Sequence, residues 1–228
     1  MDFLNNGIPS KNGQYEIIKV LGQGAFGIAY LANDNQNQKS QVVIKATQYN
    51  DEDQLNQDQL ADQEWQMYKK FDHPNIVKFY DVFYEKNTLC MVIEYANSGT
   101  LTQLINQQRS KQEYLDESTI WGIFIQIVHA ICYVHSQKVI HRDIKSDNIF
   151  LHKQNDNIFV KIGDFGLSKQ LSQTRELAKT IAGTMMYAAP EQLNFEGYNN
   201  LVDMWAVGCV LYELCCLKSP FRGRSEEH

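Results

Sequence analysis

The stretch HRDIKSDN, residues 141–148, follows a long apolar run and brings three different polar groups into one loop. Asp143 is followed two positions later by Lys145 and five positions later by Asn148. A carboxylate can accept a proton, a lysine can neutralise developing charge, and an amide oxygen can bind a metal ion. Shorter strings of these residues are common by chance, so the prediction rests on the complete run. It indicates a catalytic loop that combines a base, a charge clamp and a metal ligand.

A second carboxylate follows a short distance along the chain. Asp164 lies in the turn GDFG, residues 163–166, directly behind a predicted strand at 159–162. The order of HRDIKSDN followed by GDFG is far more specific than either motif alone.

Upstream, the run LGQGAFG at residues 21–27 lies between two predicted strands. Glycines lack a Cβ atom, so backbone N–H groups can approach phosphate oxygens closely. A glycine-rich hairpin without any ligand explains the run equally well by itself. A dinucleotide-binding fold would need a helix directly after the glycines, and the strand predicted here counts against that alternative.

Lys45 ends the next predicted strand, VVIK at residues 42–45. A lysine at a strand end is usually only solvated. Glu64, on the helix predicted to follow, favours a phosphate-binding role for Lys45, because an acidic partner would fix the lysine side chain near the same phosphates. The order of glycine-rich loop, lysine and acid therefore predicts a phosphate-binding site.

The apolar spacing divides the chain into a strand-rich first part and a mainly helical second part, joined at the polar residues 96–99. Strands are predicted at 15–21, 28–32, 41–45, 77–84, 88–95 and 159–162. Helices are predicted at 53–71, 101–108, 118–137 and 201–217. The last of these is apolar nearly all round, so we expect it to be a central, buried helix.

Composition sets limits on the class of protein. The chain has 228 residues, 43 % of them hydrophobic, which suits one large domain or two small lobes. Its net charge of −6 argues against nucleic acid or an anionic membrane surface as a partner. The most apolar window, 120–134, is too short to span a bilayer, and the five cysteines lack metal-site spacing. We expect a cytoplasmic protein, with nuclear or cytoskeletal association left open.

Taken together, these motifs resemble those of eukaryotic protein kinases over residues 15–221. The resemblance includes the Gly-Thr pair at 183–184, the APE motif at 189–191, and DMW at 203–205. It implies an α+β, bilobal fold. The implied organisation is an N-terminal extension at 1–14, a small antiparallel β N-lobe with one helix at 15–95, a mainly α C-lobe at 96–221, and a polar tail at 222–228.

In such kinases several further helices follow the position of residues 219–221, so we expect the C-lobe to be incomplete. The absence of those helices would leave apolar residues of the 201–217 helix poorly covered. The residues expected to be affected are Val207, Val210, Leu211 and Leu214.

The resemblance also implies roles for single residues. Asp143 would orient the substrate hydroxyl and accept its proton, and Lys145 would neutralise charge on the transferred phosphoryl group. Lys45 would pair with Glu64, and Asn148 and Asp164 would hold Mg²⁺. The residues implied to bind ATP are Leu21, Gly22, Gln23, Gly24, Ala25, Phe26, Gly27, Ala29, Val43, Lys45, Glu64, Ile93, Glu94, Ala96 and Phe150. Thr100 stands where many relatives carry an acid for the ribose.

Lys145 and Thr184 resemble the Ser/Thr type of kinase, and the motifs around them look most like the NIMA-related group; calcium/calmodulin-dependent-like and other Ser/Thr groups are alternatives. The resemblance implies protein substrates that dock near Thr184. It also implies activation by phosphorylation of Thr180, either by an upstream kinase or by a second copy. A pseudokinase scaffold and an inactive kinase fragment are the alternative functions.

Overall fold

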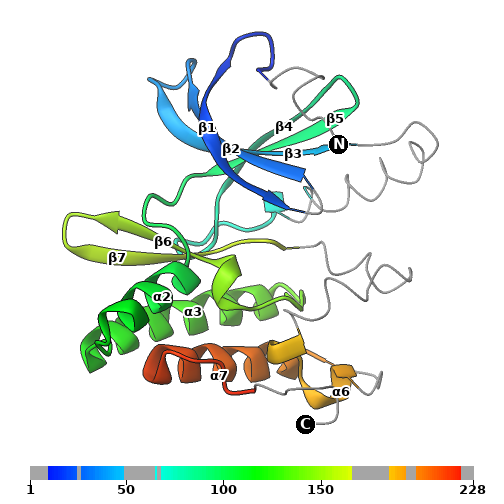
Figure 1. Ribbon diagram of the computed structural model, residues 1–228. Coiled ribbons are helices and arrows are strands. Elements are labelled where there is room, and N and C mark those ends of the chain that lie inside the picture. The colour runs from blue at the N-terminus through cyan, green and yellow to red at the C-terminus, as the bar shows by residue number, and fades with distance from the viewer. Residues whose placement is uncertain are drawn as a thin grey trace. The chain divides into compact units, whose positions relative to one another are not determined.

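The computed structural model describes residues 10–24, 27–48, 65, 68–165, 185–193 and 199–221. The chain divides into two compact units, each drawn in Figure 1. The sheet unit comprises Met1–Asp72 and Val77–Tyr95, and the helical unit comprises His73–Ile76 and Ala96–His228.

The sheet unit contains one antiparallel sheet of five strands in the order β1-β2-β3-β5-β4. The strands are β1 (Tyr15–Gly24), β2 (Gly27–Asp34), β3 (Ser40–Gln48), β4 (Phe79–Glu85) and β5 (Thr88–Glu94). Side chains alternate between the two faces of a strand, and the buried positions of β3 are Val42, Ile44 and Ala46. This face packs into an apolar core and so fixes the register of the opposite face.

The helix predicted at 53–71 falls mostly outside the described residues. Trp65, Tyr68 and Lys69 are helical, Tyr68 is buried, and the Trp65 ring stacks on Phe79 with 6.3 Å between centroids. Trp65 therefore packs on β4 within the sheet unit.

The helical unit is built on the helices α2 (Leu101–Lys111), α3 (Glu117–Ser136) and α7 (Leu201–Cys216). Shorter elements are η2 (Ser146–Asn148), the hairpin of β6 (Ile149–Gln154) and β7 (Asn157–Ile162), η3 (Met185–Tyr187) and α6 (Pro190–Leu193). Thr100 and Gln103 form a reciprocal capping box that begins α2, and Asp116 caps α3. The antiparallel β sheet and this helical part confirm the predicted α+β kinase-like fold.

Helix α3 is longer than the apolar window of residues 120–134 predicted from the sequence. It is 20 residues long, and by length and composition alone it could cross a bilayer, so the prediction that this apolar run is too short to span a membrane was wrong. Its apolar stripe is buried, however, and the helix packs against β7 and α7. The buried stripe consists of Ile123, Ile127, Ala130, Ile131 and Val134. Packing inside the unit therefore accounts for this stripe, whereas Trp121 and Ile125 on the same helix are exposed. The expectation that the protein has no membrane partner stays a prediction.

Helix α7 differs from both predictions made for it. Val207, Val210 and Leu214 are buried, and Leu211 is half-buried, so the expected loss of cover does not fall on these residues. The helix is not buried all round either. Its exposed apolar residues are Leu201, Met204, Trp205 and Tyr212. These residues recur at helical spacing and therefore lie along one face of α7. A helix that packs next to α3 buries only the face that it turns toward the core, so this other face stays exposed.

Candidate active site

Asp143 is the centre of a compact charged cluster in the loop between α3 and β6. The Nζ atom of Lys145 donates to both carboxylate oxygens of Asp143, at 3.0 Å to Oδ1 and 2.8 Å to Oδ2. The Nδ2 atom of Asn148 donates to Oδ2 at 2.8 Å and to the Asp143 carbonyl oxygen at 2.9 Å. Charge-assisted hydrogen bonds of this kind are short and directional, so the two neighbours fix the orientation of the carboxylate.

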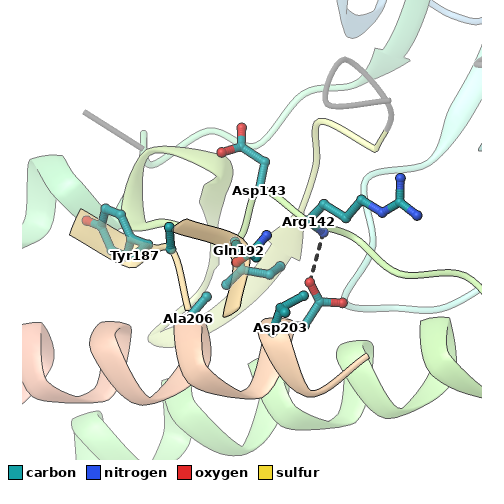
Figure 2. A pocket seen from close by; sticks show the side chains of 9 residues that line it. Arg142, Asp143, Tyr187, Gln192, Asp203 and Ala206 are labelled. Atoms are coloured by element: carbon teal, nitrogen blue, oxygen red, sulfur yellow. Dashed lines mark hydrogen bonds between the residues drawn. The ribbon is translucent and has the colours of Figure 1, made fainter. Parts of the chain in front are cut away.

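The backbone of this loop is held by a carboxylate from α7. Asp203, only 1 % exposed, accepts the backbone N–H of His141 on Oδ2 and that of Arg142 on Oδ1, both at 2.8 Å. The φ angle of Arg142 is 69°, in the left-handed region that non-glycine residues rarely adopt. Figure 2 shows the bond from Arg142 to Asp203, with the carboxylate of Asp143 directed away from α7. Asp203 thus compensates for a strained backbone and turns Asp143 outward.

His141 joins the catalytic loop to the turn that carries Asp164. Its Nδ1 atom accepts the N–H of Asp143 at 3.3 Å, and its Nε2 atom lies 3.1 Å from the carbonyl oxygen of Gly163. These partners fit a neutral ring protonated on Nε2. Burial lowers the pKa of His141 below its ordinary value of 6.5, against the opposing pull of Asp203. The ring also packs on Phe165, with 4.5 Å between centroids.

Asn148 and Asp164 are brought together by the backbone. The N–H of Gly163 donates to the carbonyl oxygen of Asn148 at 3.1 Å, and Asp164 follows with a φ of 63°. Because the amide nitrogen of Asn148 is directed at Asp143, its Oδ1 atom is the one suited to a cation. Among the described residues no group of three or more His, Cys, Asp or Glu side chains gathers as a metal site. An amide and a carboxylate beside phosphate oxygens nevertheless fit Mg²⁺, which needs few protein ligands.

The sheet register gathers the predicted nucleotide residues of the sheet unit on one face. Ala29 of β2 pairs directly with Lys45 of β3, and Val43 pairs with Ile93 of β5. Directly paired residues share a face, as do residues two positions apart on one strand. This face lies opposite the one that carries Ile44 in the core. The four predicted residues therefore form one contiguous surface on the sheet.

The glycine-rich loop is a β hairpin, with Gly24 paired to Gly27; Ala25 and Phe26 lie outside the described residues. Gly27 has a φ of +146°, and a Cβ atom there would lie 2.1 Å from the carbonyl oxygen of Ala46. A Cβ atom on Gly22 would meet nothing within 4 Å. Close strand packing therefore requires glycine at position 27, whereas Gly22 faces open space, as a phosphate-binding position would need.

A family profile described as a protein kinase domain matches residues 15–228. The chain belongs to the protein kinase domain family. It is 42 % identical to the serine/threonine-protein kinase Nek5 of Homo sapiens over 93 % of this chain and 29 % of that protein. It is 41 % identical to Nek8 of Danio rerio over 91 % of this chain and 29 % of that protein.

A third relative, the serine/threonine-protein kinase nekl-2 of Caenorhabditis elegans, is 38 % identical over 92 % of this chain and 60 % of that protein. The chain spans about a third of the length of the first two relatives. These relatives confirm the predicted resemblance to Ser/Thr kinases of the NIMA-related group.

The remaining predicted site residues of this kinase domain lie in several places. Leu21 and Gln23 are on β1, Glu94 ends β5 and accepts the N–H of Lys78, Ala96 begins the second segment of the helical unit, and Phe150 is on β6. Glu64, Thr180 and Thr184 lie outside the described residues. The Thr100 hydroxyl accepts the N–H of Gln103 as the cap of α2, so its side chain has a structural role. The roles predicted for these residues stay predictions.

Two acids that support the kinase loop were not predicted from sequence. Asp203 and Glu213 lie on α7 among apolar residues, and both are buried in the helical unit. A charged side chain is almost never fully buried without a partner. An acid at a core-facing position of an apolar helix therefore indicates a buried carboxylate that has a polar partner. The sequence does not indicate which segment supplies that partner.

A cavity of about 30 Å³ lies behind the catalytic loop, between it and α7 (Figure 2). Gln192 reaches into this region from α6, and its Oε1 atom accepts the N–H of Ala189 at 3.0 Å. The cavity has room for about one water molecule, whereas ligand pockets run to hundreds of Å³. The cavity is therefore a packing gap and is too small to be the nucleotide site.

Proposed function

We propose that this kinase domain transfers the γ-phosphoryl group of Mg-ATP to serine or threonine hydroxyls of proteins. The observation that carries the proposal is the geometry of Asp143, which Lys145 and Asn148 hold at 2.8 to 3.0 Å. Such an arrangement suits a reaction in which catalysis is mainly positioning and charge stabilisation. The serine/threonine-protein kinases among the relatives support the choice of hydroxyl.

The geometry also suggests which atom accepts the proton. Among the described residues, Oδ2 of Asp143 accepts hydrogen bonds from Lys145 and Asn148, whereas Oδ1 accepts one from Lys145 only. Oδ1 is therefore the oxygen suited to orient the substrate O–H and take its proton as the new O–P bond forms and the bond from the γ-phosphorus to the oxygen of the departing ADP breaks. The Lys145 ammonium lies beside this carboxylate, where it would stabilise negative charge on the transferred group.

Mg-ATP supplies the phosphoryl donor when bound. In this proposal Asn148 Oδ1 and the Asp164 carboxylate hold Mg²⁺, and Lys45 lies on the sheet face that binds the nucleotide together with Ala29 and Val43. The short link from Gly163 to Asn148 supports the metal assignment, because it keeps the two ligands in adjacent segments.

Regulation and substrates form the second part of the proposal. Phosphate on Thr180 would attract the guanidinium of Arg142, next to the catalytic Asp143, and the added charge would order the segment. Protein substrates would dock near Thr184, and either an upstream kinase or a second copy of this chain would phosphorylate Thr180. The positions of these residues in the sequence motif support this part.

Radiolabel transfer from ATP to a generic protein substrate, followed by phosphoamino-acid analysis, tests the function. We expect label on serine and threonine, and the Asp143→Asn variant should transfer at least about 100-fold more slowly, since a general base contributes 10²- to 10⁴-fold. Both proteins should show the same rise in melting temperature with Mg-ATP. A wild type that binds Mg-ATP but transfers no faster than Asp143→Asn would instead be a scaffold. A chain that gains no stability from Mg-ATP would be an inactive fragment.

A further inference from the structure

Glu213 is a buried carboxylate for which the proposed reaction gives no role. It lies on α7 and is 7 % exposed. The Tyr187 hydroxyl lies 2.9 Å from its Oε1 and 2.8 Å from its Oε2, and the Ser146 hydroxyl donates to Oε2 at 2.8 Å. The two hydroxyl oxygens are themselves 2.8 Å apart. We call these three residues the hydroxyl cluster.

The charge of Glu213 is balanced by hydroxyl groups. Among the described residues no Lys, Arg or His forms an ion pair with it. Burial is the main cause that raises the pKa of Tyr187, so its phenol keeps its proton and remains a donor. Each hydroxyl has one hydrogen, and the carboxylate has two oxygens to accept them. Removal of either hydroxyl therefore takes away half of the hydrogen bonds that make this buried charge tolerable.

The hydroxyl cluster joins three segments that are far apart in the sequence. Ser146 opens η2 in the catalytic loop, Tyr187 ends η3, and Glu213 is in the fourth turn of α7. In the loop, Ser146 stands next to Lys145 and two residues before Asn148. The N–H of Asn148 donates to the carbonyl oxygen of Lys145 at 3.0 Å, so Ser146 lies within a single turn bounded by the two residues that hold Asp143.

The two acids of α7 divide the support of the catalytic loop between them. Asp203 accepts backbone N–H groups at the start of the loop, at residues 141 and 142. Glu213 binds a side chain at its end, ten residues further along the same helix. Two fixed points on one rigid helix restrict both translation and rotation of the loop, which a single point cannot do.

We propose that the hydroxyl cluster is a positioning device that fastens the second half of the catalytic loop to α7 and keeps Lys145 and Asn148 in contact with Asp143. It rests on the proposed function, since positioning matters only if Asp143 takes part in transfer.

The test compares Ser146→Ala and Tyr187→Phe with the wild type in two measurements. Each change should lower kcat about tenfold, the value of one hydrogen bond to a buried charge, while KM for Mg-ATP stays within about twofold. Hydrogen exchange of the amides of Asn148 and Gly163, which close the loop, should become about tenfold faster in both variants. The exchange measurement does not depend on phosphoryl transfer.

Matched controls separate positioning from loss of stability. Ser110→Ala and Tyr114→Phe remove a hydroxyl from exposed residues and should leave kcat and loop exchange unchanged. Ile127→Val, in the core of α3, should lower the melting temperature without a selective loss of kcat. If Ser146→Ala and Tyr187→Phe lower kcat no more than Ile127→Val does, and loop exchange does not change, the inference is overturned. If the wild type transfers no faster than Asp143→Asn, the proposed function fails, and loop exchange alone decides whether the hydroxyl cluster holds the loop.

Discussion

Helices α3 and α7 are both apolar and pack against each other, but they support the catalytic loop in different ways. The buried stripe of α3 contains only apolar residues, such as Ile123, Ile127 and Val134. The buried face of α7 includes two carboxylates, Asp203 and Glu213, and each of them binds the loop directly. The loop therefore takes its shape from α7, whereas α3 contributes apolar packing and one polar contact to Asp203 itself, from His135 Nε2 to Oδ2 at 2.8 Å.

This difference matters because packing and buried charge restrict a structure differently. Apolar contacts are not directional and tolerate small shifts, so the buried stripe of α3 can stabilise the unit without fixing any one atom of the loop. A buried carboxylate must meet its donors at short distances, and a shift of the loop would strand the charge. The α7 helix thus sets the position of the catalytic loop, and changes in the two helices should have different consequences.

The largest effect on stability should come from Asp203→Asn. In this variant an NH2 group replaces one carboxylate oxygen and faces the backbone N–H of His141 or Arg142, so a hydrogen bond becomes a contact between two donors. The left-handed turn at Arg142 then loses part of the hydrogen bonding that stabilises it. We expect a loss of about 3 kcal/mol in the free energy of unfolding, measured by urea denaturation at neutral pH. Asp156→Asn, in the exposed turn between β6 and β7, is the control. Equal stability of the two variants would show that Asp203 does not anchor the loop.

A smaller effect should appear as pH dependence at His141. Its pKa is lower in the folded protein than the ordinary value of 6.5, because burial disfavours the charged ring. Below about pH 6.5 the unfolded chain takes up a proton that the folded chain does not. The contribution of the neutral His141 ring to the free energy of unfolding is therefore fully present above about pH 6.5. Below that pH the free energy of unfolding falls by up to about 1.4 kcal/mol per pH unit, until the folded-state pKa is reached.

His141→Phe removes this titrating group while it keeps an aromatic ring beside Phe165. The variant should be less stable at neutral pH, since it lacks the bond to Gly163, but its stability should decline less between pH 6.5 and 5.5 than that of the wild type. Thermal melts at the two pH values measure the decline. Parallel declines in the two proteins would rule out His141 as the source.

The smallest effect should come from α3. Ile127 is fully buried, and Ile127→Val removes one methyl group, which typically costs about 1 kcal/mol. Urea denaturation measures this loss. Because no directional contact to the loop is changed, the activity of the folded protein should stay within about twofold of the wild type. If the fully folded Ile127→Val variant were much less active than the wild type, α3 would also position the loop, and the contrast with α7 would disappear.

Much of the site could be predicted from the sequence, because its members are close along the chain. Asp143, Lys145 and Asn148 lie within six residues, so the motif itself specifies their contacts. The strands of the sheet unit could be predicted as well, since alternation of buried and exposed side chains repeats along each one. The strand β6 was missed, because its short run IFLHKQ mixes apolar and polar residues and follows the catalytic motif without a turn signal.

The supporting acids could not be placed for a physical reason. Asp203 is 62 residues from His141, and Glu213 is 67 residues from Ser146, so no periodic pattern links them. In addition, α7 is apolar on both of its faces, and hydrophobicity alone cannot say which face is covered. Residues such as Leu201 and Met204 are exposed although they look like core residues in the sequence.

The most direct test of the contrast between α7 and α3 is the kcat of Asp203→Asn beside that of Ile127→Val. Both are measured for phosphoryl transfer at saturating Mg-ATP, at a temperature at which each variant is fully folded. A catalytic group displaced by about 1 Å can lose about 100-fold in rate, so kcat should fall to that extent in Asp203→Asn. In Ile127→Val it should stay within about twofold of the wild type. An equal fall in both variants, or no fall in Asp203→Asn, would contradict the conclusion that a buried carboxylate of α7 positions the catalytic loop.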